Sequence, residues 1–314
     1  MYTGKRVLLI GGGGSLGLYA AQELVSKGCY VDVLCQEDHV SNDPKLQFFI
    51  ADANLEHLQE FMADKHYDGI INFLHYRNME NYKNVHQFLS TNTDHLIFLS
   101  SYRVYADLQH PITEDAPRLL DVIKDDPEFL EKEDYALAKA RAEDFIRQSG
   151  TSNWTIVRPV ISTSFRRFDL VNISGTRLLR WTAEGKVIPL PEKARDLIAA
   201  VDWAGNTGKL IANLLFKKDA YGEAFTVSSC QNLTWGQVAE YYEELIGARF
   251  QWVSTEAYLD QLEPGQLWSL IYDRLYDRPI DNSKILRVTG LTQTDFKPMK
   301  EGIQIELKKR EEMQ

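Results

Sequence analysis

The first half of the chain alternates short apolar runs with longer stretches of mixed polarity. The runs Arg6–Ile10 and Tyr30–Cys35 are rich in aliphatic residues, and the stretch 19–27 between them has helical spacing and stops at Gly28. Strands that alternate with helices of this length are typical of a parallel sheet with helices on both faces. The chain is therefore predicted to open with a strand, a helix and a second strand.

The same alternation continues to about residue 160. Right-handed crossovers would place the C-terminal ends of all these strands along one edge of the sheet, where such sheets bind ligands. The pattern thus predicts an α/β fold, a doubly wound parallel sheet of the Rossmann type. Further strands are expected at 46–51, 69–74, 95–99 and 154–158, and further helices at 54–65, 78–90 and 134–148.

The periodicity changes after residue 160, where strands and helices no longer alternate regularly. We expect residues 1–160 and 195–248 to form the dinucleotide-binding domain, and 161–194 with 249–314 a smaller, discontinuous C-terminal substrate domain. Thr234 and Gln237 are spaced as a capping box at the start of a helix. Strands are expected at 196–201, 224–228 and 250–254, helices at 174–183, 204–215, 284–288 and 300–310, and an irregular excursion at 106–133.

A run of glycines follows the first predicted strand. Gly11, Gly14 and Gly17 fit one dinucleotide-binding spacing, and Gly12, Gly14 and Gly17 fit another. Glycines allow a tight turn and a close approach of the backbone to a pyrophosphate, and the helix that follows offers unpaired N–H groups. We expect a dinucleotide site here.

Charge and composition exclude several classes of protein. The 314 residues carry a formal net charge of −10, which argues against a general nucleic-acid binder. No secretory signal and no membrane-spanning run is visible, and the three cysteines lack metal-ligand spacing. The expected protein is cytoplasmic, binds no metal and acts on a small molecule.

Tyr135 and Lys139 are four residues apart, so they share one face of the helix predicted at 134–148. A free tyrosine has a pKa of about 10, and a nearby ammonium favours its phenolate. Ser101 follows the strand at 95–99 and can share a substrate oxygen with the tyrosine. This trio suits acid–base catalysis on a carbinol or carbonyl.

With these motifs, the chain resembles an extended short-chain dehydrogenase/reductase of the NAD-dependent epimerase/dehydratase family over nearly its whole length. The glycine spacing Gly11, Gly14, Gly17 matches that family. So do the segments 100–105 (SSYRVY), with Ser101 as the catalytic serine, and 111–115 (PITED). Tyr135 and Lys139 fall on the catalytic pair. The segments at 234–235 and 281–284 resemble a subgroup related to chloroplast stem-loop-binding proteins.

The resemblance implies an NAD-dependent enzyme whose substrate is a nucleotide sugar. It also implies a homodimer built from the helices at 78–90 and 134–148. The sequence does not distinguish an epimerase from a dehydratase or a reductase. NADP is not excluded, because the strand tip at Gln36 is not acidic, although Glu37 and Asp38 follow it. The alternative is a non-catalytic module that senses the dinucleotide and binds a protein or RNA partner.

The remaining candidates concern binding. His75 follows the strand at 69–74, and Arg166 and Arg177 are placed to bind substrate phosphates. Trp268, Tyr272 and Tyr276 have helical spacing and are expected to pack in a core rather than to stack on a sugar. The residues expected to contact the cofactor are Gly11, Gly14, Ser15, Leu16, Gly17, Gln36, Asp52, Ala53, Phe73, Leu74, Lys139 and Pro159.

Overall fold

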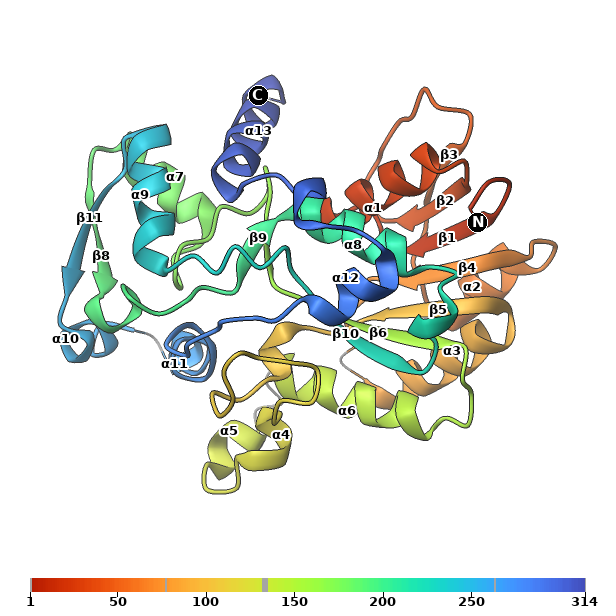
Figure 1. Cartoon of the computed structure of the whole chain (residues 1–314), viewed down its shortest axis with the longest axis horizontal. Coiled ribbons are helices and arrows are strands. Elements are labelled where there is room, and N and C mark those ends of the chain that lie inside the picture. Colours follow the sequence, from red (N-terminus) through yellow and green to blue (C-terminus); the bar gives the residue numbers. More distant parts are fainter. Residues whose placement is uncertain (1, 77, 132–134, 263, 314) are drawn as a thin grey trace.

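The computed structural model describes residues 2–76, 78–131, 135–262 and 264–313 (Figure 1). Its centre is a sheet of seven parallel strands, in which β1 pairs with β2 on one side and β4 on the other. The order reverses between β1 and β4, which is the topological switch point where such folds bind ligands. From edge to edge the strands are β10 (Glu223–Val227), β6 (Trp154–Pro159), β5 (Thr93–Leu99), β4 (Tyr67–Asn72), β1 (Arg6–Ile10), β2 (Tyr30–Cys35) and β3 (Leu46–Ile50).

Helices cover both faces of this sheet because its central strands are apolar on both sides. Leu9 packs with one group of helices, and Leu8 and Ile10 pack with the other. The first face carries α1 (Ser15–Ser26), α8 (Ala204–Leu214) and α12 (Ser283–Thr289), and the second carries α2 (Leu55–Met62), α3 (Met79–Thr91) and α6 (Tyr135–Gln148).

A second group of elements packs around its own core beyond the C-terminal edge of the sheet (Figure 1). Two short parallel pairs join segments that are distant in sequence, β7 with β9 and β8 with β11. The elements are β7 (Ile161–Thr163), α7 (Gly175–Ala183), β8 (Val187–Pro191), β9 (Val201–Trp203), α9 (Trp235–Ile246), β11 (Arg249–Val253), α10 (Thr255–Leu259), α11 (Pro264–Ser269), the π-helical turn η4 (Leu270–Arg274) and α13 (Met299–Glu312).

The predicted α/β fold and the doubly wound sheet are confirmed, and so is the capping box of Thr234 and Gln237 at α9. The strand predicted at 196–201 is wrong: the ordered strand is β9, and only Val201 belongs to both. The excursion at 106–133 contains two short helices, α4 (Leu119–Val122) and α5 (Pro127–Glu131). The domain boundaries stay a prediction.

Helices α3 and α6 lie side by side, with the rings of Tyr82 and Phe145 5.9 Å apart. The outer face of α3 presents Lys83, Asn84 and Gln87 to solvent. The homodimer expected through these helices stays a prediction. Among the described residues, the helices are all too short or too polar to cross a bilayer.

Candidate functional site

The glycine turn between β1 and α1 has the geometry of a phosphate cradle. Gly11 adopts φ +69°, in the left-handed region that favours glycine. A Cβ on Gly17 would lie 2.3 Å from the carbonyl oxygen of Gly12, so only glycine allows α1 to approach the turn this closely. At Gly14, the N-cap of α1, an added Cβ would meet no atom within 4 Å. The turn therefore has no room for a side chain at Gly17, whereas the space next to Gly14 is empty.

An ion pair between Glu37 and Arg166 lies next to the glycine turn. Glu37 follows β2, and its carboxylate accepts from Arg166 at 3.0 Å. The Arg166 guanidinium also reaches the carbonyl oxygen of Gly13 at 3.4 Å. A hollow of about 280 Å³ lies beneath, lined by the glycine turn, Ser15, Leu16, Phe73 and Arg166. Glu37 thus supplies an acidic group beside this hollow, one residue beyond the predicted Gln36.

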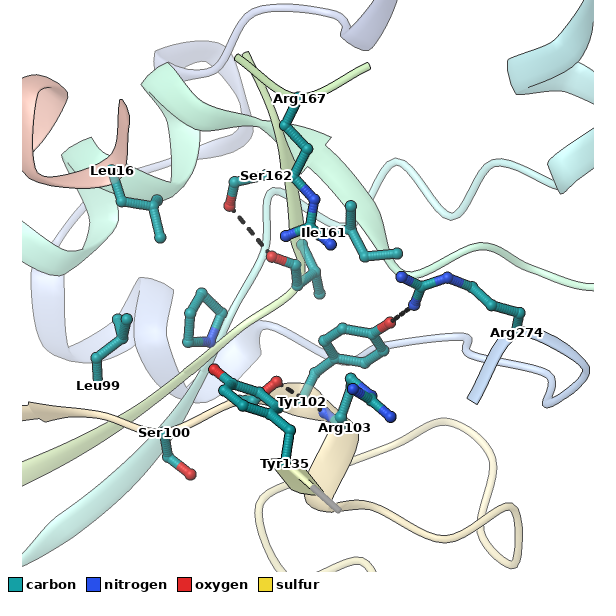
Figure 2. Close-up of a pocket in the computed structure, with 13 residues that line it drawn as sticks. Leu16, Leu99, Ser100, Tyr102, Arg103, Tyr135, Ile161, Ser162, Arg167 and Arg274 are labelled. Atoms are coloured by element: carbon teal, nitrogen blue, oxygen red, sulfur yellow. Dashed lines mark hydrogen bonds between the residues drawn. The ribbon is translucent and has the colours of Figure 1, made fainter. Parts of the chain in front are cut away.

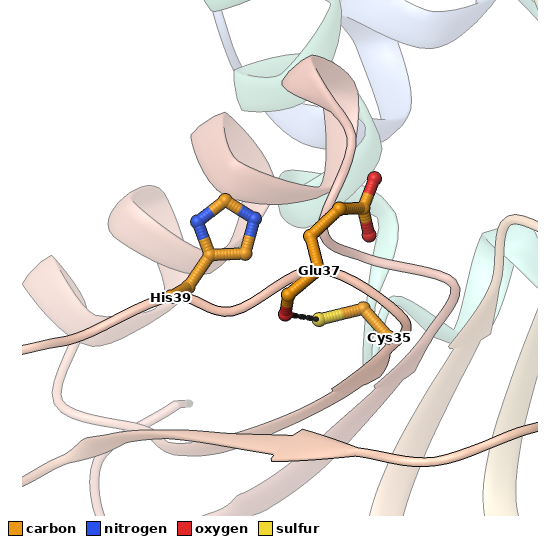
Figure 3. A group of neighbouring side chains, drawn as sticks. All are labelled: Cys35, Glu37 and His39. Atoms are coloured by element: carbon orange, nitrogen blue, oxygen red, sulfur yellow. Dashed lines mark hydrogen bonds between the residues drawn. The ribbon is translucent and has the colours of Figure 1, made fainter. Parts of the chain in front are cut away.

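Cys35, Glu37 and His39 gather around the loop after β2, with one ligand atom of each within 4.8 Å of the others (Figure 3). Each of these groups already has a partner: the Cys35 thiol donates to the Glu37 carbonyl, and His39 Nε2 lies 3.1 Å from the Gly13 carbonyl. Burial also raises the pKa of the Cys35 thiol, whereas metals bind the thiolate. Metal binding here would require these contacts to break and the thiol to lose its proton.

Gln36 and Asp52 follow neighbouring strands of the sheet, β2 and β3. The Gln36 amide donates to the Asp52 carboxylate at 2.6 Å, which joins the ends of β2 and β3. Asp52 and Ala53 line a hollow of about 540 Å³ that extends to Tyr76 on the loop before α3. The two predicted contact residues therefore border a volume large enough for an aromatic base.

Tyr135 and Ser101 share a cavity of about 410 Å³ at the end of the sheet (Figure 2). Tyr135 is the first described residue of α6, and Ser101 caps the 3₁₀ turn η1 (Tyr102–Val104) by accepting from the Arg103 N–H at 3.2 Å. Pro159 also lines the cavity. The cavity and the hollow beneath the glycine turn have these lining residues in common: Leu16, Leu99, Ser162 and Arg167.

Arg103 and His75 lie beside the Tyr135 ring. The centre of the ring lies 5.7 Å from the Arg103 guanidinium and 4.9 Å from the His75 ring. Burial raises the pKa of Tyr135, while Arg103, Arg167 and a hydrogen bond from Ser101 act in the opposite direction. The positive charges that favour the phenolate are thus arginines, which the sequence analysis did not single out for this role.

Lys139 lies behind Tyr135 and faces the protein interior. Its ammonium is 5.7 Å from the centre of the Tyr135 ring and donates to the backbone carbonyls of Leu74 and Leu99. The side chain is 2 % exposed, and burial lowers its pKa to about 7, while Glu143 acts in the opposite direction. The predicted residue is therefore next to the tyrosine, but outside the described lining of the cavity.

A buried ion pair supports the base of α6. Glu143 is fully buried and accepts from Arg158 at 2.6 Å and from the Ser100 hydroxyl. Because Arg158 belongs to β6 and Ser100 follows β5, this pair fixes the helix against the sheet below Tyr135. Removing one partner of such a pair leaves an uncompensated buried charge, which is costly.

A tight turn after β7 carries the arginines over the groove. Ser164 and Arg167 exchange two backbone hydrogen bonds, of 2.9 and 2.7 Å. Phe165, one of the two residues between them, is held by α13: its N–H donates to Glu306 at 2.8 Å, and its carbonyl accepts from Arg310 at 3.2 Å. The C-terminal helix therefore positions the loop that carries Arg166 and Arg167.

Glu306 is the central acceptor of this contact. The carboxylate is fully buried and also accepts from Tyr19 of α1 and from Trp203 Nε1, the latter at 2.8 Å. A buried carboxylate needs such partners, since an unpaired one is strongly destabilising. Glu306 thus links the C-terminal helix, α1, β9 and the arginine turn.

Three of the sequence-based candidates lie elsewhere. Arg177 is on α7 with its guanidinium 5.4 Å from the centre of the Trp181 ring, and it lines none of the described cavities. Its role in substrate binding stays a prediction. Trp268 and Tyr272 pack against Phe129 of α5, at 5.8 and 4.3 Å between ring centres, which confirms their expected place in a core.

The sequence analysis missed Arg103, Arg274 and Asp273 as site residues. Arg103 stood inside a motif already quoted, two residues after the serine, so its place beside Tyr135 could have been found. Arg274 lies in η4, more than a hundred residues from every other lining segment, and no local pattern marks it. Asp273 is buried behind both arginines.

Solved structures with this fold match the chain over nearly its full length. The epimerase Mth375 of Methanothermobacter thermautotrophicus has a TM-score of 0.73 and 15 % identity, and covers 99 % of this chain and 94 % of its own. MoeE5, solved with UDP-glucuronic acid and NAD, has a TM-score of 0.71 and 15 % identity, covering 98 % and 100 %. UDP-N-acetylglucosamine 4-epimerase of Bacillus cereus has 0.68 and 17 %, covering 98 % and 99 %.

No family model matches the sequence, and no curated protein matches it. The chain is thus similar in fold to epimerases and short-chain dehydrogenase/reductase proteins, as its motifs predicted, at an identity that carries the fold alone. The kinship to stem-loop-binding proteins stays a prediction.

Proposed function

We propose that the protein is an NAD-dependent enzyme of the epimerase/dehydratase type, which acts on a carbinol or carbonyl of a nucleotide sugar. One observation carries the proposal: the hollow under the glycine turn continues into the cavity that holds Tyr135 and Ser101. A dinucleotide with its phosphates at Gly14 would lie along this groove with its far end beside the tyrosine. Three solved structures of the same fold contain NAD, and one of them also contains a nucleotide sugar.

The residues present fit the cofactor. Gly14 leaves open space where a phosphate would approach, and the N-terminus of α1 offers its N–H groups there. Glu37 stands where an acidic side chain would accept from the ribose hydroxyls, which favours NAD over NADP. When bound, NAD supplies a hydride acceptor.

In this proposal Tyr135 removes the hydroxyl proton of the substrate, and Ser101 holds the same oxygen. Arg103 and Arg167 stabilise the phenolate by charge. His75, whose ring lies against Tyr135, borders the substrate, and Lys139 keeps the loop at Leu74 and the end of β5 together. All of these supporting roles depend on the Tyr135 hydroxyl oxygen being the group that takes the proton.

The test is Tyr135→Phe, which keeps the ring and removes the hydroxyl. Turnover of a nucleotide sugar, followed by NADH absorbance and by NMR of the epimers, should fall ~10²–10⁴-fold, the usual contribution of a positioned proton-transfer group. The affinity for NAD, measured by calorimetry, should be unchanged. If both proteins bind NAD and behave alike toward a panel of nucleotide sugars and small alcohols, the alternative of a non-catalytic binding module is favoured instead.

A further inference from the structure

Three arginines from three separate parts of the chain face the cavity beside Tyr135. Arg103 belongs to η1, Arg167 ends the turn after β7, and Arg274 ends η4. In Figure 2 the end of Arg167 projects into the cavity, and the end of Arg274 is directed at Tyr102. Arg103 and Arg167 act by charge on Tyr135, but that role does not include Arg274 and does not use the terminal nitrogens of Arg167. Their convergence needs another explanation.

Two of these arginines keep donors available. Arg167 uses Nε for Asp169 at 2.7 Å, and its terminal nitrogens have no partner within the described chain. Arg274 uses Nε for the carbonyl of Val171 at 2.8 Å, and one terminal nitrogen for Tyr102 and Asp273. Its other terminal nitrogen is without a partner in the described ranges. A guanidinium presents its donors in a planar fork that matches a carboxylate.

Arg103, Arg167 and Arg274 together form what we call the arginine wall. One buried carboxylate, Asp273, contacts two of them on the side away from the cavity. Asp273 is 2 % exposed and contacts Arg274 and Arg103, with Arg278 3.7 Å away. Burial by itself would raise the pKa of Asp273, but the charges of Arg274, Arg103 and Arg278 hold it below its usual value. The acid is therefore ionised, and its contacts hold Arg103 and Arg274 in place at the cavity.

We propose that Arg167 and Arg274 bind a carboxylate on the part of the substrate that reacts at Tyr135, so that the substrate is an acidic sugar or another hydroxy acid. The inference rests on the proposed function, since it takes Tyr135 as the reacting group. Arg103 links the two, because its guanidinium lies 5.7 Å from the centre of the Tyr135 ring on the same cavity. An anion held by this wall is thus beside the reacting oxygen. The diphosphate of a nucleotide sugar is the other anion that could reach it.

The experiment compares ligands that differ only in the carboxylate. Calorimetry on the NAD-loaded protein would use UDP-galacturonate against UDP-galactose, and free galacturonate against galactose. We expect each acid to bind about 10- to 100-fold more tightly than its neutral counterpart, as charge-assisted hydrogen bonds provide. In Arg167→Gln this preference should shrink to about threefold or less, with the affinity for UDP-galactose nearly unchanged. Arg167→Lys, which keeps the charge, should restore part of it.

Arg180→Gln is the matched control, because it removes the same charge at a position away from the cavity. Arg180 lies on α7, and its side chain is 63 % exposed. This variant should keep the full preference for the acids. If neither acid binds more tightly than its neutral counterpart, the proposal is overturned. If Arg167→Gln weakens UDP-galacturonate and UDP-galactose equally, the anion is the diphosphate, and the proposal is overturned as well.

These measurements read binding, so they separate this proposal from the proposed function. Tyr135→Phe should keep the preference for the acid and lose turnover. A preference for acids together with unchanged turnover in Tyr135→Phe would leave the carboxylate site standing and remove the assigned chemistry. Thermal melting of each variant checks that the fold is intact.

Discussion

The two ends of the groove are built in different ways. At one end, under the glycine turn, the backbone of Gly11, Gly14 and Gly17 shapes the surface within a single turn. At the other end, beside Tyr135, side chains shape it, with Arg103 and Arg274 brought together from opposite halves of the chain. A backbone cradle suits a ligand that many proteins share, whereas a wall of side chains selects one substrate among many.

The forces differ as well. The glycine turn depends on the absence of side chains, so its function is lost by adding atoms. The arginine wall depends on Asp273 behind it, so its function is lost by removing charge. Variants can therefore be chosen to damage one end while leaving the other as it is.

The largest effect is expected for Gly14→Val. A Cβ here meets no protein atom within 4 Å, and the residue has φ −76°, which valine adopts, so the fold should hold. The added methyl groups would fill the space for a phosphate. We expect the affinity for NAD to fall at least ~100-fold, about 2.7 kcal/mol, in calorimetry, with a melting temperature close to that of the wild type.

Gly17→Ala serves as the contrast. Its Cβ would meet the backbone of Gly12 at 2.3 Å, so this variant should lose stability along with binding. If Gly14→Val binds NAD as tightly as the wild type does, the phosphates do not lie at this turn.

An intermediate effect concerns Lys139, between the two ends. Burial lowers its pKa to about 7 in the folded protein, whereas an unfolded lysine titrates near ~10.4. Between these values the unfolded chain binds a proton that the folded chain has released, so stability rises with pH. Without cofactor, the free energy of unfolding of the wild type relative to Lys139→Met should rise by about 1 kcal/mol per pH unit above pH 7.

Urea unfolding at several pH values between 6 and 9 measures this slope. Lys308→Met is the matched control, since Lys308 is 78 % exposed and its removal should give a difference that does not change with pH. Parallel curves for the wild type and Lys139→Met would show that Lys139 keeps an ordinary pKa.

The smallest effect is expected at Glu37, which tests how the backbone end selects its cofactor. The wild type should bind NAD at least as well as NADP, because the Glu37 carboxylate would repel a 2′-phosphate. In Glu37→Gln that repulsion is lost and Arg166 is released from its ion pair. We expect the ratio of NADP to NAD affinity to rise about 5- to 10-fold in calorimetric titrations.

The double variant Glu37→Gln/Arg166→Gln separates the two contributions, because it lacks the cation that would hold the phosphate. Its ratio should return toward that of the wild type. A wild-type preference for NADP would show that a different basic residue binds the ribose phosphate.

The difference between the two ends of the groove also decides how much of the site the sequence predicts. The glycine turn, Ser101 and Tyr135 are local patterns, and the structure places all of them along one groove. The central sheet was predictable because its strands are continuous apolar runs. Arg274 was not, since its position depends on how η4 packs beyond the sheet. Nor was the environment of Lys139, because burial depends on the tertiary structure around the Leu74 and Leu99 carbonyls.

The strand predicted at 196–201 failed for a related reason. Its apolar residues are largely buried, as an apolar run predicts. Outside β9, however, the segment pairs within the described chain only through an isolated bridge between Ile198 and Thr234. Burial against α9 and η4 satisfies the apolar side chains without a continuous strand partner. Apolar content thus reports burial more reliably than it reports strand pairing.

The contact between Phe165 and α13 also has a consequence for synthesis on the ribosome. The glycine turn leaves the ribosome early, but the turn that carries Arg166 and Arg167 is fixed by Glu306 and Arg310, which are translated about 140 residues later. Chains grow at ~5–20 residues per second, so seconds pass between the synthesis of the arginine turn and that of the helix that fixes it. The turn that carries Arg166 and Arg167 therefore takes its final position over the glycine turn only after α13 has docked.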